Sequence, residues 1–334
     1  MGLSLVACHD PGSNGTTPDA PTGDAVPGVG CTARAPRTVD PEVFVGPTGL
    51  ENRLIAAIGG ATTSLDVQMY LFTVDSIADA IIAAHRRGVN VRVLLDPDHE
   101  GNNQTRPALV AAGVPTRNVT SLYTFAHAKY LVIDGTTALI MSMNFNYDAM
   151  SSERNYGIVD RDPEDVADVA AIFEMDWASG GGEPPKPADL SCTRLIVSPN
   201  NSKLRILELI NSATATLDVE VLYLSETSVR NAVGAAKARG VSVRVILAES
   251  QNEEPDTSIA YLKGLGIPVK IATSFYLHAK LIVADGVAFV GSENMSQTSL
   301  TKNREVGALV FEPTPAAIIA QQFTADWNVA TPAP

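Results

Sequence analysis

The sequence predicts an α/β fold made of two tandem halves, each a mixed β-sheet flanked by helices, related to one another by a pseudo-twofold axis. Three observations lead to this prediction. Segments of the first half of the chain recur in the second half, strand-like and helix-like patterns alternate within each copy, and one polar motif occurs once in each copy. The composition, 45% apolar and 18% charged over 334 residues, is typical of a packed globular protein.

The internal repeat extends over nearly the whole of each half. The segment ATTSLDVQMYLF (61–72) matches ATATLDVEVLYL (213–224), and the offset between the copies falls only from 152 residues at Asp66 to 150 residues at Trp177. Such a gradual change indicates a tandem duplication with short gaps. The chain is therefore expected to have four parts: an N-terminal tether (1–38), a first half (39–178), a linker (179–190) and a second half (191–334).

Each half is expected to run strand, helix, strand, strand, strand, helix. In the first half, SLDVQMYLF (64–72) alternates apolar and polar residues as a strand does, and SIADAIIAAHRRG (76–88) has apolar residues at helical spacing. VNVRVLLD (89–96) is typical of a buried strand. AKYLVID (128–134) and ALIMSMN (138–144) follow as strands joined by a turn at a glycine. The order strand–helix–strand predicts a layered α/β domain.

Residues 1–38 differ in composition from the rest of the chain. The stretch HDPGSNGTTPDAPTGDAVPGVG (9–30) is rich in Gly, Pro, Ser, Thr and Asp and is expected to be a flexible tether. LVAC (Leu5–Cys8) resembles the lipobox of bacterial lipoproteins, in which the cysteine is lipidated. The resemblance implies a protein of the bacterial cell envelope, anchored at Cys8, or a secreted one. An ordinary disordered tail is the alternative.

Two further cysteines, Cys31 and Cys192, each stand just before a repeat begins. A pair of cysteines suits an oxidising compartment, where disulfides persist. The sequence leaves two possibilities open, a disulfide between the two cysteines or two unpaired thiols.

The polar motif reads His-x-Lys, followed five residues after the lysine by Asp. Side chains alternate faces along a strand, so the histidine and the lysine of one copy point the same way, about 7 Å apart. The aspartate lies beyond the strand, near a turn, and points elsewhere. Two such pairs face to face would supply a nucleophile, a general acid and two cations, which cleavage of a phosphodiester requires. The predicted catalytic residues are therefore the motif residues, His127, Lys129 and Asp134 in the first half and His278, Lys280 and Asp285 in the second.

Polar residues downstream of each motif are expected to complete the site. Ser142 and Asn144 follow the first motif, and Ser292 and Asn294 follow the second. Hydroxyl and amide groups can donate hydrogen bonds to phosphate oxygens. These four residues are therefore predicted to bind substrate.

Carboxylates are expected to orient the two histidines. Glu305 stands 27 residues after His278 and is predicted to accept a hydrogen bond from that imidazole and fix its tautomer. The first half has the opposite order, with Glu153 before Asn155, where the second half reads Asn-Arg-Glu. Positions two apart share a face of a strand, so Glu153 is predicted to reach the histidine of its own half, His127.

These motifs resemble the signature of the phospholipase D superfamily, H-x-K-x-x-x-x-D followed by a Gly/Ser-x-Asn segment, and the resemblance covers nearly all of residues 41–329. It implies two α/β halves that share one active site, a phosphohistidine intermediate, and no catalytic metal or other cofactor. Members of the superfamily include phospholipases D, phospholipid synthases, nucleases and a few proteases. By analogy with the family, His127 is assigned as nucleophile and His278 as general acid, with the reverse assignment left open.

Other candidate residues have simpler explanations. His85 and His99 stand alone near helix and loop ends and are expected to be surface residues. A zinc site is poorly supported, because no two histidines have ligand spacing and lysines stand beside the candidates. Six aromatic residues either line a lipid-facing mouth or pack in the core: Tyr70, Tyr123, Phe125, Tyr147, Phe275 and Tyr276.

The sequence therefore predicts a phosphodiesterase of the phospholipase D type, a hydrolase that degrades phospholipids at a membrane surface and also transfers their phosphatidyl group to alcohols. A net charge of −13 repels polyanions, so nucleic acid is the poorer partner. The alternatives are a secreted nuclease of the same superfamily and an inactive lipoprotein that binds phospholipid or phosphate. A monomer is expected.

Overall fold

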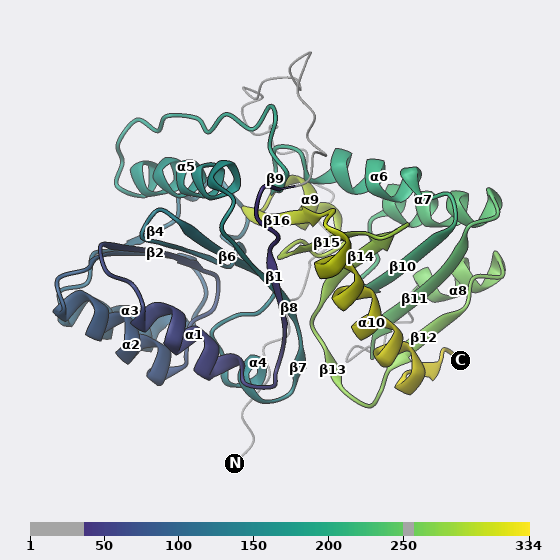
Figure 1. Cartoon of the computed structure of the whole chain (residues 1–334), viewed down its shortest axis with the longest axis horizontal. Helices are drawn as coiled ribbons and strands as arrows, with labels where there is room; N and C mark the ends of the chain where they lie inside the picture. The colour runs from purple at the N-terminus through teal and green to yellow at the C-terminus, as the bar shows by residue number, and fades with distance from the viewer. Residues whose placement is uncertain (1–36, 250–256) are drawn as a thin grey trace.

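The chain forms two α/β halves that lie side by side, the first at the left of Figure 1 and the second at the right. The computed structural model describes residues 37–249 and 257–334, so residues 1–36 of the predicted tether, with Cys8 and Cys31, lie outside the described residues. The last two residues predicted as tether are part of the fold, because Arg37 is buried and bonded to Asp160 and Asp165. Cys192 is disulfide-bonded. The two mixed sheets, each flanked by helices, confirm the predicted fold class.

The sheet of the first half joins a parallel part to an antiparallel part. β2, β3 and β4 pair in parallel, with helices as crossovers between them. β5, β6, β8 and β1 continue antiparallel from the other edge of β2. The spatial order of the seven described strands is β1 (Glu42–Val45), β8 (Tyr156–Asp160), β6 (Thr137–Met141), β5 (Tyr130–Ile133), β2 (Ser64–Met69), β3 (Asn90–Leu95) and β4 (Thr116–Asn118).

The sheet of the second half has the same order, with one further short strand at its edge. β10, β11 and β12 form the parallel part, and β14, β15, β16 and β9 form the antiparallel part. In spatial order the described strands are β17 (Thr331–Pro332), β12 (Val269–Ala272), β11 (Ser242–Ala248), β10 (Thr216–Val221), β14 (Lys280–Ala284), β15 (Val287–Gly291), β16 (Glu305–Val310) and β9 (Leu195–Ser198).

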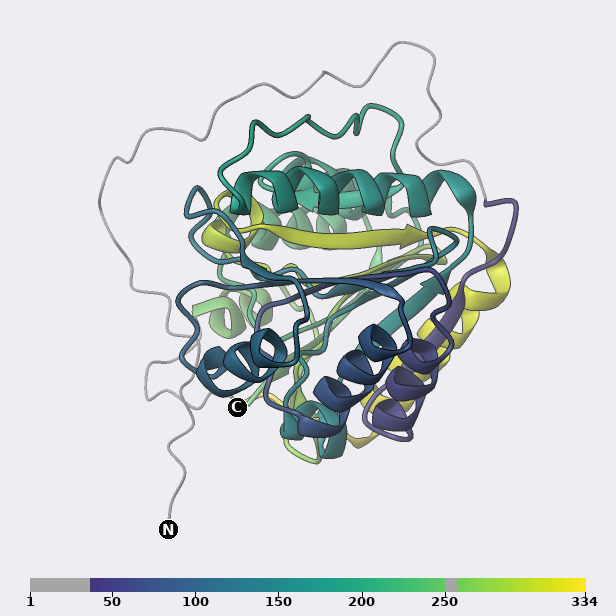
Figure 2. The same cartoon turned by 90° about the vertical axis from the view of Figure 1, so that its left-hand side faces the viewer.

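Helices cover both faces of each sheet. In the first half α1 and α2 pack on one face and α5 packs on the other, as Figure 2 shows. α2 ends at Arg86, where Gly88 takes a φ of 91° and lets the chain turn into β3. The described helices are α1 (Leu50–Gly59), α2 (Asp75–Arg86), α3 (Asn102–Ala111), α4 (Tyr147–Ser151), α5 (Pro163–Gly180), α6 (Ser202–Ser212), α7 (Thr227–Ala238), α8 (Thr257–Gly264), α9 (Gln297–Thr301) and α10 (Pro313–Val329).

Some elements are not predicted by the sequence patterns. β7 (Glu153–Arg154) and β13 (Tyr276–Leu277) contain two residues each, too few to show an alternating pattern. α1 and α3 are also absent from the predicted order of elements. The predicted linker begins at residue 179, inside α5, which continues to Gly180.

One apolar core lies between the two halves and belongs to both. It contains the inner faces of the two sheets together with α5 and α10, including Tyr130 and Ile158 from the first half and Leu281 and Phe323 from the second. Burying one large apolar side chain contributes roughly 1.5–3 kcal/mol, so separating the halves would be costly.

No helix within residues 37–249 and 257–334 combines the length and apolar character needed to cross a membrane.

A buried acid distinguishes the second sheet from the first. Glu220 on β10 stands where the repeat has Gln68 on β2, and both side chains are fully buried. Tyr156 donates a hydrogen bond to Glu220 Oε2 at 2.9 Å, and the Asp326 carboxylate of α10 lies beside them, 3.3 Å from the Tyr156 hydroxyl. Burial, and then the Asp326 charge, raise the pKa of Glu220 well above its usual value.

A Glu220→Gln variant, which copies Gln68, is expected to be more stable than the native protein at pH 8 and to lose this advantage near pH 4. Because the pKa of Glu220 is raised, the folded state keeps a proton that the unfolded state releases above its pKa of about 4.3. The free energy of unfolding of the native protein therefore falls as the pH rises from there toward the folded pKa. Calorimetry at pH 8 should show a melting temperature about 3 °C higher or more.

Glu208→Gln is the matched control, because Glu208 is exposed on α6. Its melting temperature should stay within about 1 °C of the native value at either pH. If Glu220→Gln shows the same small change at pH 8, the buried proton contributes nothing to the pH dependence of stability.

Candidate active site

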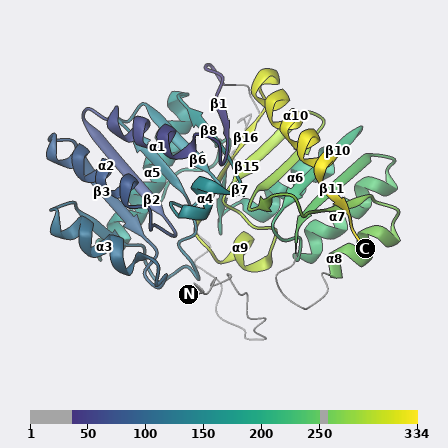
Figure 3. The ribbon, with the colours of Figure 1, turned by 90° about the horizontal axis from the view of Figure 1, so that it is seen from below.

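The two His-x-Lys motifs lie where the two halves meet. β7 of the first half pairs in parallel with β13 of the second, and Ala126 forms an isolated bridge with Arg304. The backbone N–H of His278 donates to the Arg154 carbonyl at 3.1 Å, and that of Arg304 donates to the Phe125 carbonyl at 2.9 Å. These main-chain bonds attach each histidine segment to the opposite half, and Figure 3 shows β7 and α4 between the two sheets.

His127 is held by a carboxylate from the second half. Its Nδ1 lies 2.8 Å from Glu305 Oε2. The other carboxylate oxygen accepts hydrogen bonds from Ser299 Oγ at 2.6 Å and from Asn303 Nδ2 at 3.0 Å. An ionised carboxylate only accepts hydrogen bonds, so the Nδ1 of His127 carries the proton and its Nε2 keeps a free lone pair.

His278 is held by an amide from the first half. Its Nδ1 lies 2.9 Å from Asn155 Oδ1 and 3.5 Å from Glu153 Oε2. Asn155 Nδ2 donates to the Glu153 carboxylate at 2.9 Å, which turns the amide oxygen toward the imidazole. The Nδ1 of His278 therefore also carries a proton, and this proton is directed to a neutral group.

These contacts correct two predictions made from the sequence. The sequence predicts that Glu305 orients His278 and that Glu153 reaches His127. In the structure each glutamate lies beside the histidine of the opposite half. The reason is the crossed pairing of β7 with β13 and of Ala126 with Arg304. A strand pattern shows which residues share a face but not which strand lies opposite.

Burial keeps both imidazoles neutral near neutral pH. Burial lowers the pKa of His127 to about 4; Glu305 opposes this effect, and Lys129 and Lys280 add to it. Burial, followed by Lys280, Lys129 and His127, lowers the pKa of His278 well below its usual 6.5. Each histidine responds to the lysine of the other motif. The two motifs therefore form one electrostatic site.

The motif lysines lie buried beside the histidines. The Lys129 ammonium donates to the His127 carbonyl, and the Lys280 ammonium donates to the His278 carbonyl at 2.6 Å. Lys129 Nζ also lies 5.0 Å from the centre of the Tyr70 ring. Two buried ammonium groups give the site a fixed positive charge that an anion can neutralise.

The motif aspartates lie at the far ends of their strands. Asp134 has a φ of 53° and Asp285 a φ of 48°, and each forms a hairpin turn with the glycine that follows. Their carboxylates accept backbone N–H bonds from residues 62–64 and 214–216. Slight burial raises the pKa of both carboxyls, but these hydrogen bonds outweigh it and lower the pKa below its usual range. The prediction that the aspartates are catalytic is wrong, because they hold turns.

The serines after each motif donate hydrogen bonds within the protein, whereas the asparagines have amide oxygens that accept none from the described residues. Ser142 Oγ donates to Asn155 Oδ1 at 2.8 Å, and Ser292 Oγ donates to the Val306 carbonyl at 3.3 Å. Both serine hydroxyls thus use their proton within the protein, contrary to the prediction that they donate to phosphate. Asn144 and Asn294 each keep a buried amide oxygen without a hydrogen-bond partner in the described structure. A half-turn of such an amide would present its N–H₂ group instead.

Two residues beside the site, Tyr70 and His99, are not among the predicted catalytic or substrate-binding residues, although Tyr70 is one of the six aromatics that could line a mouth. The Tyr70 ring lies with its centre 4.6 Å from that of His127 and 4.7 Å from that of His99. The sequence places His99 on the surface, but it is half-buried and its pKa responds to the charge of Lys129. His99 follows the parallel strand β3, and the carboxyl ends of parallel strands are where α/β proteins bind ligands. That position is the signal that could have identified it.

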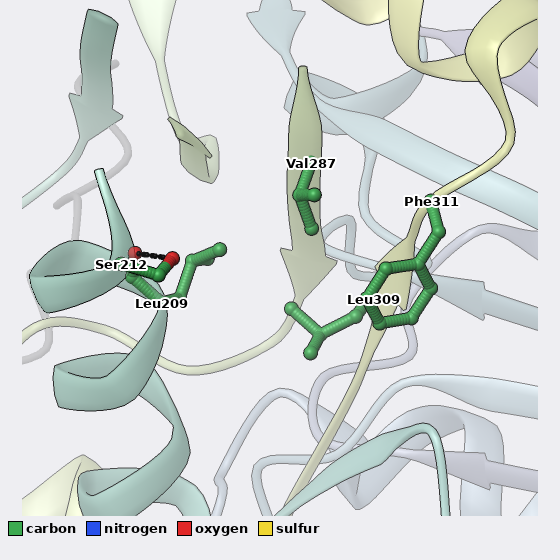
Figure 4. Close-up of a pocket in the computed structure, with 5 residues that line it drawn as sticks. All are labelled: Leu209, Ser212, Val287, Leu309 and Phe311. Carbon is green, nitrogen blue, oxygen red and sulfur yellow. Dashed lines mark hydrogen bonds between the residues drawn. The ribbon is translucent and has the colours of Figure 1, made fainter. Parts of the chain in front are cut away.

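The described residues also line a small apolar pocket away from this site, between α6 and the second sheet (Figure 4). Its lining consists of Leu209, Ser212, Val287, Leu309 and Phe311. The Ser212 hydroxyl donates to the Leu209 carbonyl at 2.8 Å and is thus engaged within the helix. In residues 37–249 and 257–334, no group of three or more His, Cys, Asp or Glu side chains is arranged to hold a metal ion.

Comparison with known proteins gives relatives for both halves. A family model described as "Cardiolipin synthase, PLD-like domain" matches residues 54–177 and 206–327. The chain is 34% identical over 128 residues to the mitochondrial cardiolipin hydrolase of Xenopus laevis, a match that covers 38% of this chain and 60% of the relative. It is 23% identical over 343 aligned residues to a cardiolipin synthase of Clostridium perfringens (strain SM101 / Type A), with 87% of this chain and 71% of the relative covered.

Solved structures share the arrangement of the two halves. Phosphatidylserine synthase of Haemophilus influenzae Rd KW20 matches with a TM-score of 0.68 and 13% identity, over 90% of this chain and 88% of that one. Polyphosphate kinase of Porphyromonas gingivalis matches with a TM-score of 0.69 and 19% identity, over 86% of this chain and 47% of that one. At these identities the likeness establishes the fold.

A Glu305→Gln variant is expected to lower the pKa of His127 below its value of about 4, because Glu305 is the group that favours the protonated imidazole. The chain has five histidines, so the ring ¹³C–¹H signals of ¹³C-histidine-labelled protein can be assigned by substitution and titrated by NMR. Glu153→Gln is the matched control and should leave the pKa of His127 unchanged. A shift of His127 in Glu153→Gln, with none in Glu305→Gln, would mean that the crossed contacts do not exist in solution.

Proposed function

The chain belongs to the phospholipase D-like family, and we propose that it is a phosphodiesterase that cleaves phospholipid head groups through a phosphohistidine intermediate. The observation that carries the proposal is the crossed support of two buried histidines, His127 by Glu305 and His278 by Asn155. Each half supplies an imidazole, a lysine and an asparagine, and each histidine takes its support from the other half. One chain therefore contains one complete site, in keeping with the expected monomer.

In the first step the Nε2 of His127 attacks phosphorus, and the bond from phosphorus to the head-group oxygen breaks. His278 donates a proton to the departing oxygen, so the head group leaves as an alcohol. The phosphorylated ring of His127 is cationic, and its Nδ1 proton is directed to the anionic Glu305. Because Asn155 offers His278 only a neutral acceptor, we assign His127 as the nucleophile.

In the second step water attacks the phosphohistidine, and His278 accepts a proton from that water. The bond from phosphorus to His127 then breaks, which restores the free lone pair on Nε2. A primary alcohol in place of water would take up the phosphatidyl group. We assign Lys129 and Lys280 to the non-bridging oxygens, whose charge their ammonium groups neutralise in both steps.

The negative charge of the bound substrate favours protonation of His278, the proposed general acid. Burial and the neighbouring Lys280 and Lys129 lower the pKa of His278. A bound phosphodiester brings a negative charge between the lysines and offsets their effect on the imidazole. His278 therefore gains its proton more readily when substrate is bound. The amides of Asn144 and Asn294, each with a buried oxygen that lacks a partner among the described residues, are assigned to the same anion.

The proposed site is suited to a membrane surface. Leu122 is 69% exposed and Tyr276 is 41% exposed, and each stands on the segment that leads into one of the two histidines. Tyr147, on α4, is also exposed, at 57%. Apolar and aromatic side chains of this kind favour the interface between lipid head groups and acyl chains. We propose that the protein acts at the bacterial cell envelope, held there by lipidation of Cys8, with residues 39–178 and 191–334 as its two halves.

Purified protein is expected to hydrolyse phosphatidylcholine in excess EDTA and to leave plasmid DNA intact, because imidazoles and ammonium groups supply nucleophile, acid and charge neutralisation. With ethanol added, phosphatidylethanol should form, and thin-layer chromatography separates both products. DNA cleavage without lipid hydrolysis would instead indicate a nuclease. Activity lost in EDTA and restored by one particular metal would contradict the metal-free mechanism. Phosphate binding with no turnover of either substrate would indicate an inactive binding protein.

His127→Ala and His278→Ala variants are each expected to lose nearly all turnover of phosphatidylcholine, roughly 10³-fold or more, because the two groups act as a unit. The assignment of roles is tested with phosphatidyl-p-nitrophenol, whose leaving group needs no proton. His278→Ala should then accumulate a ³²P-labelled phosphoprotein, and His127→Ala should not. Label found in His127→Ala alone would reverse the two roles, and full turnover in either variant would contradict the shared site.

A further inference from the structure

His99 stands beside the proposed site without a part in the reaction steps. It lies in the loop between β3 and α3, and its ring packs edge-on against Tyr70, with ring centres 4.7 Å apart. The same Tyr70 ring packs edge-on against His127 at 4.6 Å. The charge of Lys129 acts on the pKa of His99. A third imidazole therefore lies one aromatic ring away from the proposed nucleophile.

The loop holds this imidazole in one orientation. The Asp96 carboxylate accepts the backbone N–H of His99 at 2.9 Å and that of Ala126 at 2.7 Å, which ties the loop to the segment entering the first motif. The backbone N–H of Gly101 donates to His99 Nδ1 at 3.1 Å. A Cβ at Gly101 would lie 2.4 Å from Leu71 Cδ1 and 3.1 Å from the His99 ring, so the loop backbone passes close beside the imidazole.

This orientation leaves one defined hydrogen-bond donor. Because Nδ1 accepts a hydrogen bond, the proton of the neutral ring is on Nε2. Burial lowers the pKa of His99; Asp96 and Glu100 oppose that effect and Lys129 adds to it, so the net shift is downward and the ring is neutral near neutral pH. Within residues 37–249 and 257–334, His99 Nε2 has no hydrogen-bond partner.

A neutral N–H donor in these surroundings suits an uncharged oxygen. The negative charges of Asp96 and Glu100 and the positive charge of Lys129 act on the same ring, and the two carboxylates together disfavour a second phosphate there. A trimethylammonium group has no acceptor and would leave the N–H without a partner. A phospholipid offers two kinds of uncharged oxygen close to its phosphodiester, the ester carbonyls of the glycerol backbone and the hydroxyls of a glycerol head group.

We propose that His99 contacts the substrate, donating its Nε2–H to an uncharged oxygen of the phospholipid next to the scissile phosphate. The inference rests on the proposed function and extends it to substrate recognition. Because Tyr70 separates His99 from His127, His99 contributes to substrate binding and not to the transfer of the phosphoryl group. Loss of one such hydrogen bond corresponds to a roughly fivefold rise in KM.

The test measures KM and kcat of the full chain and of His99→Ala in mixed micelles of three lipids. Diacyl phosphatidylcholine has ester carbonyls and no head-group hydroxyl, dialkyl-ether phosphatidylcholine has neither, and dialkyl-ether phosphatidylglycerol has hydroxyls alone. A KM rise of about fivefold confined to the diacyl lipid identifies the carbonyl, and one confined to phosphatidylglycerol identifies the hydroxyl. The value of kcat should stay within about twofold in both cases.

Two further variants separate recognition from folding. His99→Gln keeps an N–H donor and should restore most of the KM. His85→Ala removes the other half-buried histidine of the first half, at the end of α2, and should change none of the three KM values.

An equal change in KM for all three lipids in His99→Ala, or no change in KM for any of them, would overturn the proposed contact. Neither outcome would contradict the hydrolytic function. A fall in kcat with unchanged KM would also overturn it, because it would give His99 a part in the chemical step. A native protein that cleaves none of the three lipids would refute the proposed function, and the inference with it.

Discussion

Two arginine–aspartate pairs, one fully buried and one partly exposed, cross between the halves, and the geometry of the site depends on them. Arg304 Nε lies 2.9 Å from Asp176 on α5, and Arg154 Nε lies 2.9 Å from Asp326 on α10. Each arginine is the sequence neighbour of a residue that holds a histidine, and neighbours on an extended chain point to opposite sides. Arg304 thus binds α5 of the first half while Glu305 faces His127. In the same way Arg154 binds α10 of the second half while Asn155 faces His278. A buried ion pair that loses one partner leaves an uncompensated charge, so the halves dock in one register.

Burial between the halves, together with two lysines, decides the protonation of the two histidines. Burial disfavours charge on an imidazole, and two nearby ammonium groups disfavour it further, so the pKa values of His127 and His278 both fall. The ammonium groups stay in place because Lys129 and Lys280 donate to the carbonyls of these same histidines. The chain as a whole carries a net charge of −13, yet its site is locally positive. Global charge repels large polyanions, whereas the local positive field favours a small anion such as the single phosphodiester of the proposed substrate.

The duplicated halves have diverged at buried acids. Glu293 of the second half stands where the first half has Met143. The Glu293 side chain is fully buried, and one of its carboxyl oxygens has no hydrogen-bond partner among the described residues. Gly291 and Gly307 provide the space, since a Cβ on either would lie 2.4–2.8 Å from that oxygen. Burial and the nearby Glu305 raise the pKa of Glu293 well above its usual value. The proposed reaction uses one nucleophile and one general acid, so the surroundings of the two histidines need not stay alike.

The sequence by itself determined the repeat, the alternating strands and helices, and the identity of the two histidine–lysine pairs, because each of these is a local pattern with a period of two or of about 3.6 residues. Only the tertiary structure decided that Glu305 faces His127, that Asp134 holds a turn, and that His99 lies beside the site. These facts depend on contacts between residues tens to hundreds of positions apart, such as the 178 that separate Glu305 from His127. A periodic pattern shows which side chains share a face of a strand, and the packing of two halves against each other decides what that face meets.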